Sequence, residues 1–179
     1  MRDTELLISL LHNPLKWGVK ESFRTYVETA GGNIEPKSPT RAEAGQFVFP
    51  FVGSQVAPTG EGEDPFTSAE FQYQGEVWFE AHDGMLAVKI INPHVVAKDK
   101  SFWLTAVDTD YLPDRSRRIR IGRLDPASAT IDASAGRAEI PVTLTIHGSQ
   151  LLGDVYPVRT PLDPLIFERK EEHSGARPA

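Results

Sequence analysis

Alternation of hydrophobic and polar residues is clearest in the middle of the chain, where it predicts a β-hairpin. The apolar side chains of residues 69–81 occupy odd positions: Phe71, Tyr73, Val77 and Phe79. A period of two residues places them on one face of a half-buried strand. His82, Asp83 and Gly84 interrupt the alternation, and Asp-Gly is a strong turn signal. Residues 85–91 are therefore expected to run back antiparallel, with His82 at the head of the turn.

A second pattern, with helical spacing, occupies residues 15–28, LKWGVKESFRTYVE. Positions three or four residues apart share one helix face: Leu15, Val19, Ser22 or Phe23, and Tyr26. Pro14 suits the start of a helix, and the glycines at 31–32 suit its end. Ser22 and Tyr26 are four residues apart, so the hydroxyl and the phenol are expected to point the same way. Taken alone, this stretch favours an amphipathic helix that covers a β core.

The remaining segments predict many short strands separated by turns. Strands are expected at residues 46–52, 102–108, 117–124, 127–133, 137–146 and 164–168. Residues 1–13 predict a short amphipathic lead-in, and residues 31–45 and 53–68 are typical of loops because they are rich in Gly, Pro and charge. Turn signals about every ten residues favour a mainly β fold, an antiparallel sandwich or barrel-like domain with a short N-terminal helical region.

Length and composition narrow the class of protein. The 179 residues fit one domain, expected at 1–168, followed by a charged tail at 169–179 that is expected to be disordered. A net charge of −6 argues against a non-specific nucleic-acid binder, whose affinity comes from neutralising phosphates. The absence of cysteine excludes disulfides and thiolate chemistry. No apolar run is long enough for a membrane span, and the start of the chain lacks a secretory signal pattern, so a cytoplasmic protein is expected.

Taken one by one, few residues of the sequence indicate a specific catalytic or binding chemistry. None of the five histidines belongs to a close metal-binding pair or a known catalytic motif. Arginines form one basic cluster, at positions 115, 117, 118, 120 and 123. A solvated strand face is the favoured interpretation of this cluster. The alternative is a grip for the carboxylate or phosphate of a ligand or partner.

Several segments in order resemble the HtaA domain, the heme-binding module of corynebacterial and other actinobacterial heme-uptake proteins. They are LKWGVKESFRTYVE at 15–28, FVFP at 47–50, YQGEVWFEAHDGMLAVKIINPHVV at 73–96 and LLGDVYPVRTPLDPLIFE at 151–168. The string W-G-V-K-x-S-F-R-x-Y, the H-D-G turn and the terminal L-D-P are specific in combination. The resemblance implies a largely β fold in which a helical tyrosine ligates heme iron and a hairpin histidine hydrogen-bonds the phenolate.

Carried to this chain, the resemblance makes Tyr26 the axial ligand of a heme b iron and His82 its hydrogen-bonding partner. A tyrosine phenol, with an ordinary pKa of about 10, is a poor ligand until it is deprotonated, and a nearby imidazole helps hold the anion. The resemblance also places Ser22 near a propionate or in the pocket wall. The family's aromatic pair before L-D-P corresponds to Val155 and Tyr156, so one porphyrin-stacking ring is lost, an effect of about 1 kcal/mol.

Three functions follow as hypotheses. The first is a heme-binding protein for intracellular carriage or uptake; the resembling proteins are generally exported, whereas this chain has no evident leader. The second is an enzyme of small-molecule, natural-product-type metabolism that reuses the pocket for a hydrophobic ligand, with heme for oxidation or without heme for cyclisation or isomerisation. In the heme-free case Tyr26 and His82 would act as an acid/base pair. The third is an interaction module whose arginine-rich strand at 115–123 docks an acidic partner. The sequence leaves the oligomeric state and the choice between carriage and catalysis open.

Overall fold

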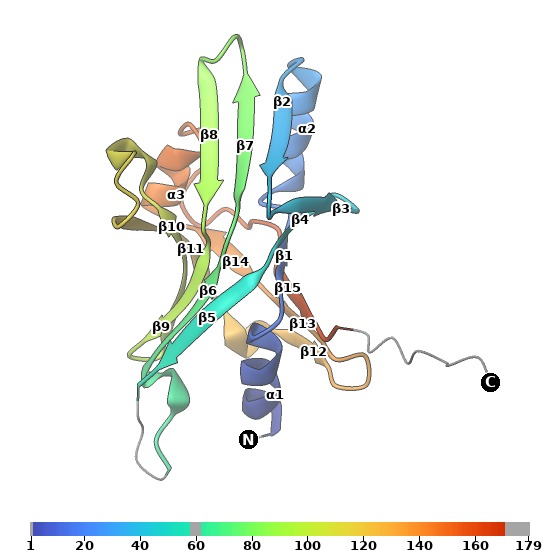
Figure 1. Cartoon of the computed structure of the whole chain (residues 1–179), viewed down its shortest axis with the longest axis vertical. Coiled ribbons are helices and arrows are strands. Elements are labelled where there is room, and N and C mark those ends of the chain that lie inside the picture. The colour runs from blue at the N-terminus through green and yellow to red at the C-terminus, as the bar shows by residue number, and fades with distance from the viewer. Residues whose placement is uncertain (1, 58–61, 171–179) are drawn as a thin grey trace, which may run out of the picture.

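The computed structural model describes residues 2–57 and 62–170, and it is built mainly from antiparallel strands (Figure 1). Sheet A has six strands in the order β12 (Thr130–Asp132), β13 (Arg137–Ile140), β15 (Leu165–Glu168), β1 (Leu15–Trp17), β4 (Gln46–Phe49) and β3 (Arg41–Glu43). Sheet C, also six-stranded, has the order β14 (Val142–Leu144), β11 (Arg118–Leu124), β10 (Ser101–Val107), β9 (His94–Lys98), β6 (Ser68–Tyr73) and β5 (Phe51–Val56). Sheet B has three strands, β2 (Asn33–Lys37), β7 (Glu76–Ala81) and β8 (Leu86–Ile91). The predicted mainly β, antiparallel fold is confirmed.

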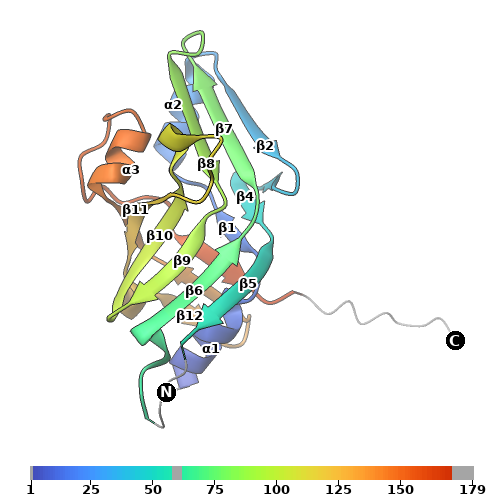
Figure 2. The same cartoon turned by 60° about the vertical axis from the view of Figure 1, so that its left-hand side comes forward.

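Three helices and three short 3-10 turns complete the part of the chain that the structure describes. The helices are α1 (Arg2–Leu11), α2 (Glu21–Thr29) and α3 (Ile146–Leu151), and the turns are η1 (Pro65–Thr67), η2 (Thr109–Tyr111) and η3 (Pro126–Ser128). Figures 1 and 2 show sheet B and α2 together at one end of the molecule, with α1 at the opposite end. No helix among residues 2–57 and 62–170 is long and apolar enough to cross a membrane.

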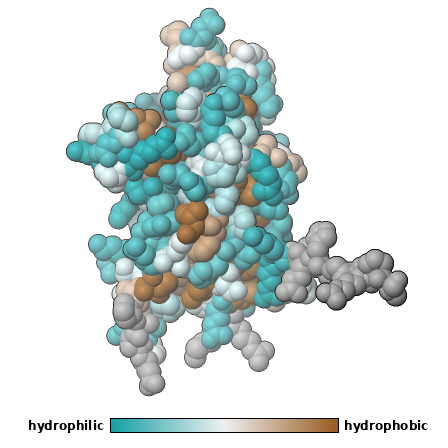
Figure 3. Space-filling model, in the orientation of Figure 1, coloured by the Kyte–Doolittle hydropathy of each residue, from teal (hydrophilic) through white to brown (hydrophobic). Residues whose placement is uncertain are grey.

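The core is one continuous cluster of apolar side chains from all three sheets and the helices. Its largest buried members are aromatic: Trp17, Phe23, Phe49, Phe71, Tyr73, Phe79 and Phe167. Tyr73 donates a 2.6 Å hydrogen bond to the carbonyl of Leu11, and burial raises the pKa of Tyr73 well above its ordinary value. Figure 3 shows hydrophobic residues only as separate small patches on one face, as expected when the apolar surface lies inside.

The helix predicted over residues 15–28 is wrong in its first part. Leu15–Trp17 is strand β1, which lies between β4 and β15 in sheet A, and Leu15 and Trp17 are both buried. Val19 has a φ of 65°, a left-handed conformation that turns the chain, and α2 begins only at Glu21. The spacing of apolar positions could not separate these alternatives, because pairing with two distant strands decides the conformation of residues 15–17.

The single strand predicted at residues 69–81 is in fact two strands in different sheets. β6 belongs to sheet C and β7 to sheet B, with a bend at Gly75. The φ of Gly75 is 132°, and a Cβ there would lie 1.7 Å from Oγ1 of Thr40, so the bend requires glycine. The hairpin itself is confirmed, because β7 and β8 pair antiparallel from Glu76 with Ile91 to Ala81 with Leu86.

Some of the remaining segment predictions are confirmed and others are wrong. Strands were predicted correctly at β10, β11 and β15. The predicted loop at 31–45 contains β2 and β3, and Pro36 is tolerated because β2 is an edge strand. Strand β9, which follows the turn at 92–93, was missed. The predicted strand at 137–146 is instead β13 and β14, separated at Pro141, and its last residue, Ile146, begins α3. Residues 171–179 of the predicted tail lie outside the described residues.

Candidate functional site

Helix α2 carries two of the predicted site residues, and a distant carboxylate holds its N-terminus. Lys20, at the N-cap, makes no capping hydrogen bond with its own side chain. Instead Oδ1 of Asp163 accepts a 3.1 Å hydrogen bond from the backbone N–H of Glu21, and Oδ2 accepts one of 2.7 Å from Arg24. Gly18 allows this approach, because a Cβ there would lie 2.4 Å from Oδ2 of Asp163. Asp163 therefore fixes where α2 starts and how it is oriented.

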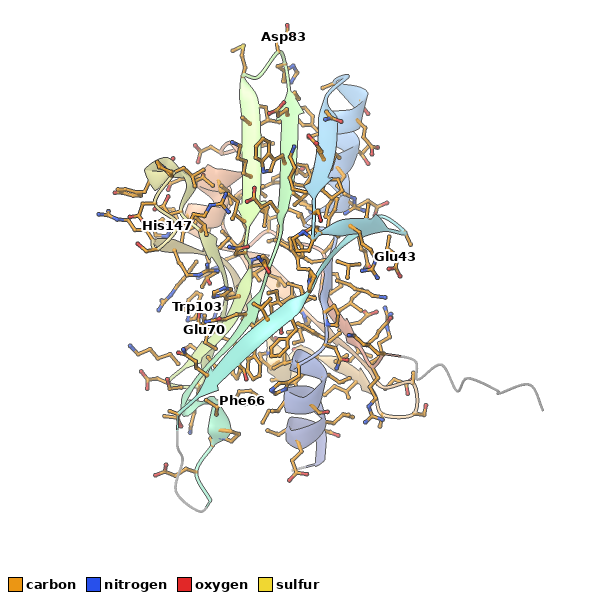
Figure 4. The ribbon with its side chains drawn as sticks, in the orientation of Figure 1. Glu43, Phe66, Glu70, Asp83, Trp103 and His147 are labelled. Carbon is orange, nitrogen blue, oxygen red and sulfur yellow. The ribbon has the colours of Figure 1, made fainter. Side chains whose placement is uncertain are left out.

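The turn between β7 and β8 places His82 above α2. His82 and Asp83 have φ angles of 54° and 55°, and Gly84 one of 86°, so the turn is left-handed at all three positions. Asp83 marks this tip in Figure 4. Nε2 of His82 lies 2.7 Å from the phenol oxygen of Tyr26, a hydrogen bond between residues 56 positions apart. Tyr26 is 43% exposed, so a ligand can approach this residue from solvent.

One helical turn earlier, Ser22 makes a second polar contact. Its hydroxyl lies 3.1 Å from the phenol oxygen of Tyr156. The Tyr156 ring packs edge-on against Phe23, with 6.5 Å between ring centroids, and Nζ of Lys20 lies 5.3 Å from the Tyr156 centroid. Ser149 donates a 2.6 Å hydrogen bond to the carbonyl of Tyr156 and so holds this loop in place.

These contacts make one surface from three parts of the chain. Tyr26 and Ser22 project from α2, His82 comes from the hairpin, and Val155 and Tyr156 come from the loop before Pro157. The loop and hairpin approach each other, because a Cβ on Gly153 would lie 3.5 Å from Cδ1 of Leu86. Two large apolar side chains of the hairpin and the loop are exposed: Met85 at 90% and Val155 at 60%. We call this surface, made of Ser22, Tyr26, His82, Val155 and Tyr156, the tyrosine surface.

The tyrosine surface combines an accessible phenol, an imidazole and exposed apolar groups. A hollow of about 510 Å³ adjoins the same turn and is lined by residues 80–84 of the hairpin and by residues 30–33, which follow α2. A phenol that shares a hydrogen bond with an imidazole can give up its proton to that imidazole, so that its oxygen can bind a hard metal ion, or it can exchange the proton with a substrate. Exposed apolar side chains around such a pair suit a flat, largely hydrophobic ligand.

The other described histidines lie away from this surface and build no metal site. Nδ1 of His94 lies 2.6 Å from Oε1 of Glu70 on sheet C, and burial, together with the charge of Arg118, lowers the pKa of His94. His12 contacts the carbonyl of Ile8 at the end of α1. Within the described residues, no group of three or more His, Asp or Glu side chains is arranged to hold a metal ion.

The tyrosine surface consists of the residues that the sequence nominated for the site, and the sequence indicated no role for Asp163, Arg24 or Lys20. The L-D-P segment that contains Asp163 was part of the family resemblance, so a signal was present. The capping role of Asp163 could not be predicted from this signal, because Asp163 and Glu21 are 142 positions apart and no local pattern links them. Ser22 and Tyr26 share a helix face as predicted, yet each has a different partner: Tyr156 for Ser22 and His82 for Tyr26.

Comparison with solved structures defines the class of fold. The C-terminal domain of HtaA from Corynebacterium glutamicum is 26% identical, with a TM-score of 0.65, over 86% of this chain and 93% of that one. The N-terminal domain of the same HtaA is 21% identical, with a TM-score of 0.63, over 88% and 96% of the two chains. The heme binding protein HtaB from the same organism is 19% identical, with a TM-score of 0.60, over 87% and 91%.

The sequence comparison leads to the family. The HtaA family model matches residues 12–168, which include every residue of the tyrosine surface. The chain therefore belongs to the HtaA family. Among curated proteins, no sequence match was found.

Proposed function

We propose that this protein binds heme b, with Tyr26 as the axial ligand of ferric iron and His82 as the partner of the phenolate. The main observation that supports this proposal is the 2.7 Å contact between the phenol oxygen of Tyr26 and Nε2 of His82 at an accessible surface. Membership of the HtaA family and the likeness in fold to a heme binding protein, HtaB, support heme as the ligand. Ferric iron is a hard ion that accepts tyrosinate, as in catalase-type hemes.

His82 has a defined part in this proposal. Coordination of heme iron by Tyr26 would require the phenol to lose its proton, and Nε2 of His82 is placed to accept that proton or to donate a hydrogen bond to the phenolate. The left-handed turn at His82 and Asp83 holds the imidazole in position, because it belongs to a paired hairpin. A partner of this kind typically changes metal affinity by about 10- to 100-fold.

The polar contacts one turn away suit the propionates of heme. Ser22 and Tyr156 each offer a hydroxyl, and the ammonium group of Lys20 supplies a positive charge beside the Tyr156 ring. Carboxylates are favoured by such donors. The apolar side chains of Val155 and Met85 would cover the porphyrin, although Val155 offers no ring for stacking. Because the phenol is accessible, we propose carriage or uptake of heme as the role.

A hemin titration of the purified protein tests the proposal. We expect a strong Soret band with ferric high-spin features, and Tyr26→Phe should lose those features and bind hemin at least tenfold more weakly. Tyr111→Phe is the matched control, because Tyr111 is similarly exposed, at 48%, and lies on η2. His82→Ala should weaken hemin binding by about 10- to 100-fold but keep a band. A Tyr26→Phe spectrum identical to that of the wild type would refute the ligand assignment.

A second candidate function is an enzyme that uses the same surface for a hydrophobic metabolite. The observation that favours it is the direct hydrogen bond between a phenol and an imidazole, which is sufficient for proton transfer without any metal. Absence of a Soret band throughout the hemin titration would favour this alternative. The protein should then be screened for isomerisation or cyclisation of apolar substrates, with activity expected to disappear in both Tyr26→Phe and His82→Ala.

A further inference from the structure

A partly buried tryptophan on sheet C lies under two arginines. Cζ of Arg120 is 4.4 Å, and Cζ of Arg123 is 5.6 Å, from the ring centroid of Trp103. Trp103 is only partly buried, whereas the next residue, Leu104, is fully buried in the core, so the indole stands on the outer face of the sheet. Figure 4 shows Trp103 on the side of sheet C away from α1, and Figure 2 shows no helix in front of β6 and β9. We call Trp103, Arg120 and Arg123 the arginine–tryptophan cluster.

A β-bulge brings the two arginines to one face. Arg120 and Arg123 are three positions apart, so an uninterrupted strand would point them to opposite faces. Here Arg123 pairs with Trp103 and Arg120 with Thr105, and the register shifts across residues 121–122, both of which are buried. Bulges re-aim side chains in this way and often lie at functional sites. The clustering is therefore a property of the folded sheet that strand periodicity alone does not predict.

The two arginines differ from the rest of the basic segment in having no polar partner. Arg115 pairs with a glutamate at 2.6 Å, and Arg117 lies 4.0 Å from an aspartate. Arg118 donates to Thr105 at 3.1 Å. By contrast, the side chains of Arg120 and Arg123 make no hydrogen bond or ion pair with any residue in 2–57 or 62–170. Their N–H groups, held over an indole, are thus available to an external acceptor.

We infer that the arginine–tryptophan cluster docks a short acidic segment of a protein partner. A guanidinium matches a carboxylate with two parallel hydrogen bonds, and Trp and Arg are enriched among the few residues that carry most of the binding energy at protein interfaces. The cluster contributes two free positive charges to a chain of net charge −6. That local charge suits a few carboxylates, whereas nucleic acid binding draws its affinity from many phosphate contacts. The cluster does not involve the tyrosine surface, so the inference is independent of heme binding.

Fluorescence anisotropy with a short fluorescein-labelled oligoglutamate peptide tests the inference. The wild-type protein should bind it at low salt and bind it less tightly as salt screens the charges. Arg120→Gln/Arg123→Gln should weaken binding about tenfold, as expected for central interface residues. The matched control is Arg115→Gln/Arg117→Gln, which removes the same charge from the same basic segment but leaves the cluster intact. It should bind within about twofold of the wild type.

Two further measurements separate the cluster from simple charge attraction. Trp103→Ala should weaken peptide binding without changing the net charge, because the indole holds the two guanidinium groups in place. Thermal unfolding of Arg120→Gln/Arg123→Gln, followed by circular dichroism, should match that of the wild type, which shows that the double variant folds. The inference is overturned if the peptide does not bind, if both double variants lose the same affinity, or if labelled oligothymidylate binds more tightly than oligoglutamate.

Discussion

Replacing Asp163 with alanine should destabilise the protein through the start of α2. In the folded protein the Asp163 carboxylate accepts hydrogen bonds from the Glu21 N–H and from Arg24. Asp163→Ala removes both acceptors at once. It also leaves the Arg24 side chain, which is only 18% exposed, without its counter-charge.

The magnitude follows from these two losses. Loss of a helix cap costs about 1 kcal/mol. Loss of a hydrogen bond to a charged group costs roughly 1.5–3 kcal/mol, and we take the lower end because the Asp163 side chain is 27% exposed and partly screened. Together they lower the free energy of unfolding by about 2–3 kcal/mol. For a chain of this size, that corresponds to a decrease in Tm of roughly 4–12 °C.

Thermal and urea unfolding, followed by circular dichroism, measure the change. Glu43→Ala is the matched control, because Glu43 also forms ion pairs but its side chain is 46% exposed, so the expected loss is below about 1 kcal/mol. Asp163→Asn keeps an acceptor for the Glu21 N–H and should fall between the wild type and Asp163→Ala. If Asp163→Ala is no less stable than Glu43→Ala, then Asp163 does not cap α2 in the way described.

Two further predictions concern pH and the core. Hydrogen bonding to Lys16, and the charges of Lys16 and Arg137, lower the pKa of Glu168, so the folded state favours the charged carboxylate. This contribution to stability is present above the pKa of Glu168 in the unfolded state and is lost as the pH falls through its lower pKa in the folded state. Acid should therefore destabilise the wild type more steeply than Glu168→Gln. Urea unfolding at pH values from neutral to acidic measures the difference. Equal dependence of stability on pH in the two proteins would contradict this prediction. Tyr73→Phe leaves the buried Leu11 carbonyl without its hydrogen-bond donor and should lower the free energy of unfolding by about 1–3 kcal/mol in urea unfolding. An unchanged urea midpoint would show that water satisfies this carbonyl.

Local sequence patterns predicted the parts of the fold that depend on one segment. The alternation before His82 and the Asp-Gly turn led to the β7–β8 hairpin, which pairs as expected. The strands β10, β11 and β15 were predicted for the same reason. In each case one side of a short segment faces the core, and a two-residue period is enough to reveal that.

Patterns failed where distant segments decide the local conformation. Residues 15–17 have apolar spacing that fits a helix, yet hydrogen bonds from β4 and β15 on both sides make them a strand. The alternation across residues 69–81 continues unbroken, although Gly75 bends the chain between two sheets. For the same reason, the sequence pattern did not predict the β-bulge that brings Arg120 and Arg123 together, because a register shift depends on the partner strand.

By itself, the sequence determined the class of fold and the hairpin with His82 at its tip, and motifs of the HtaA family nominated the residues of the tyrosine surface. The resemblance also implied the contact between Tyr26 and His82, whereas only the tertiary structure showed that Ser22 contacts Tyr156 and that Asp163 caps α2. The hydrogen bonds from Tyr26 to His82 and from Glu21 to Asp163 join segments 56 and 142 positions apart. Hydrophobic periodicity reports only which face of one segment is buried. Contacts between segments depend on pairing and packing free energies summed over the whole chain, and these take effect only when the chain folds.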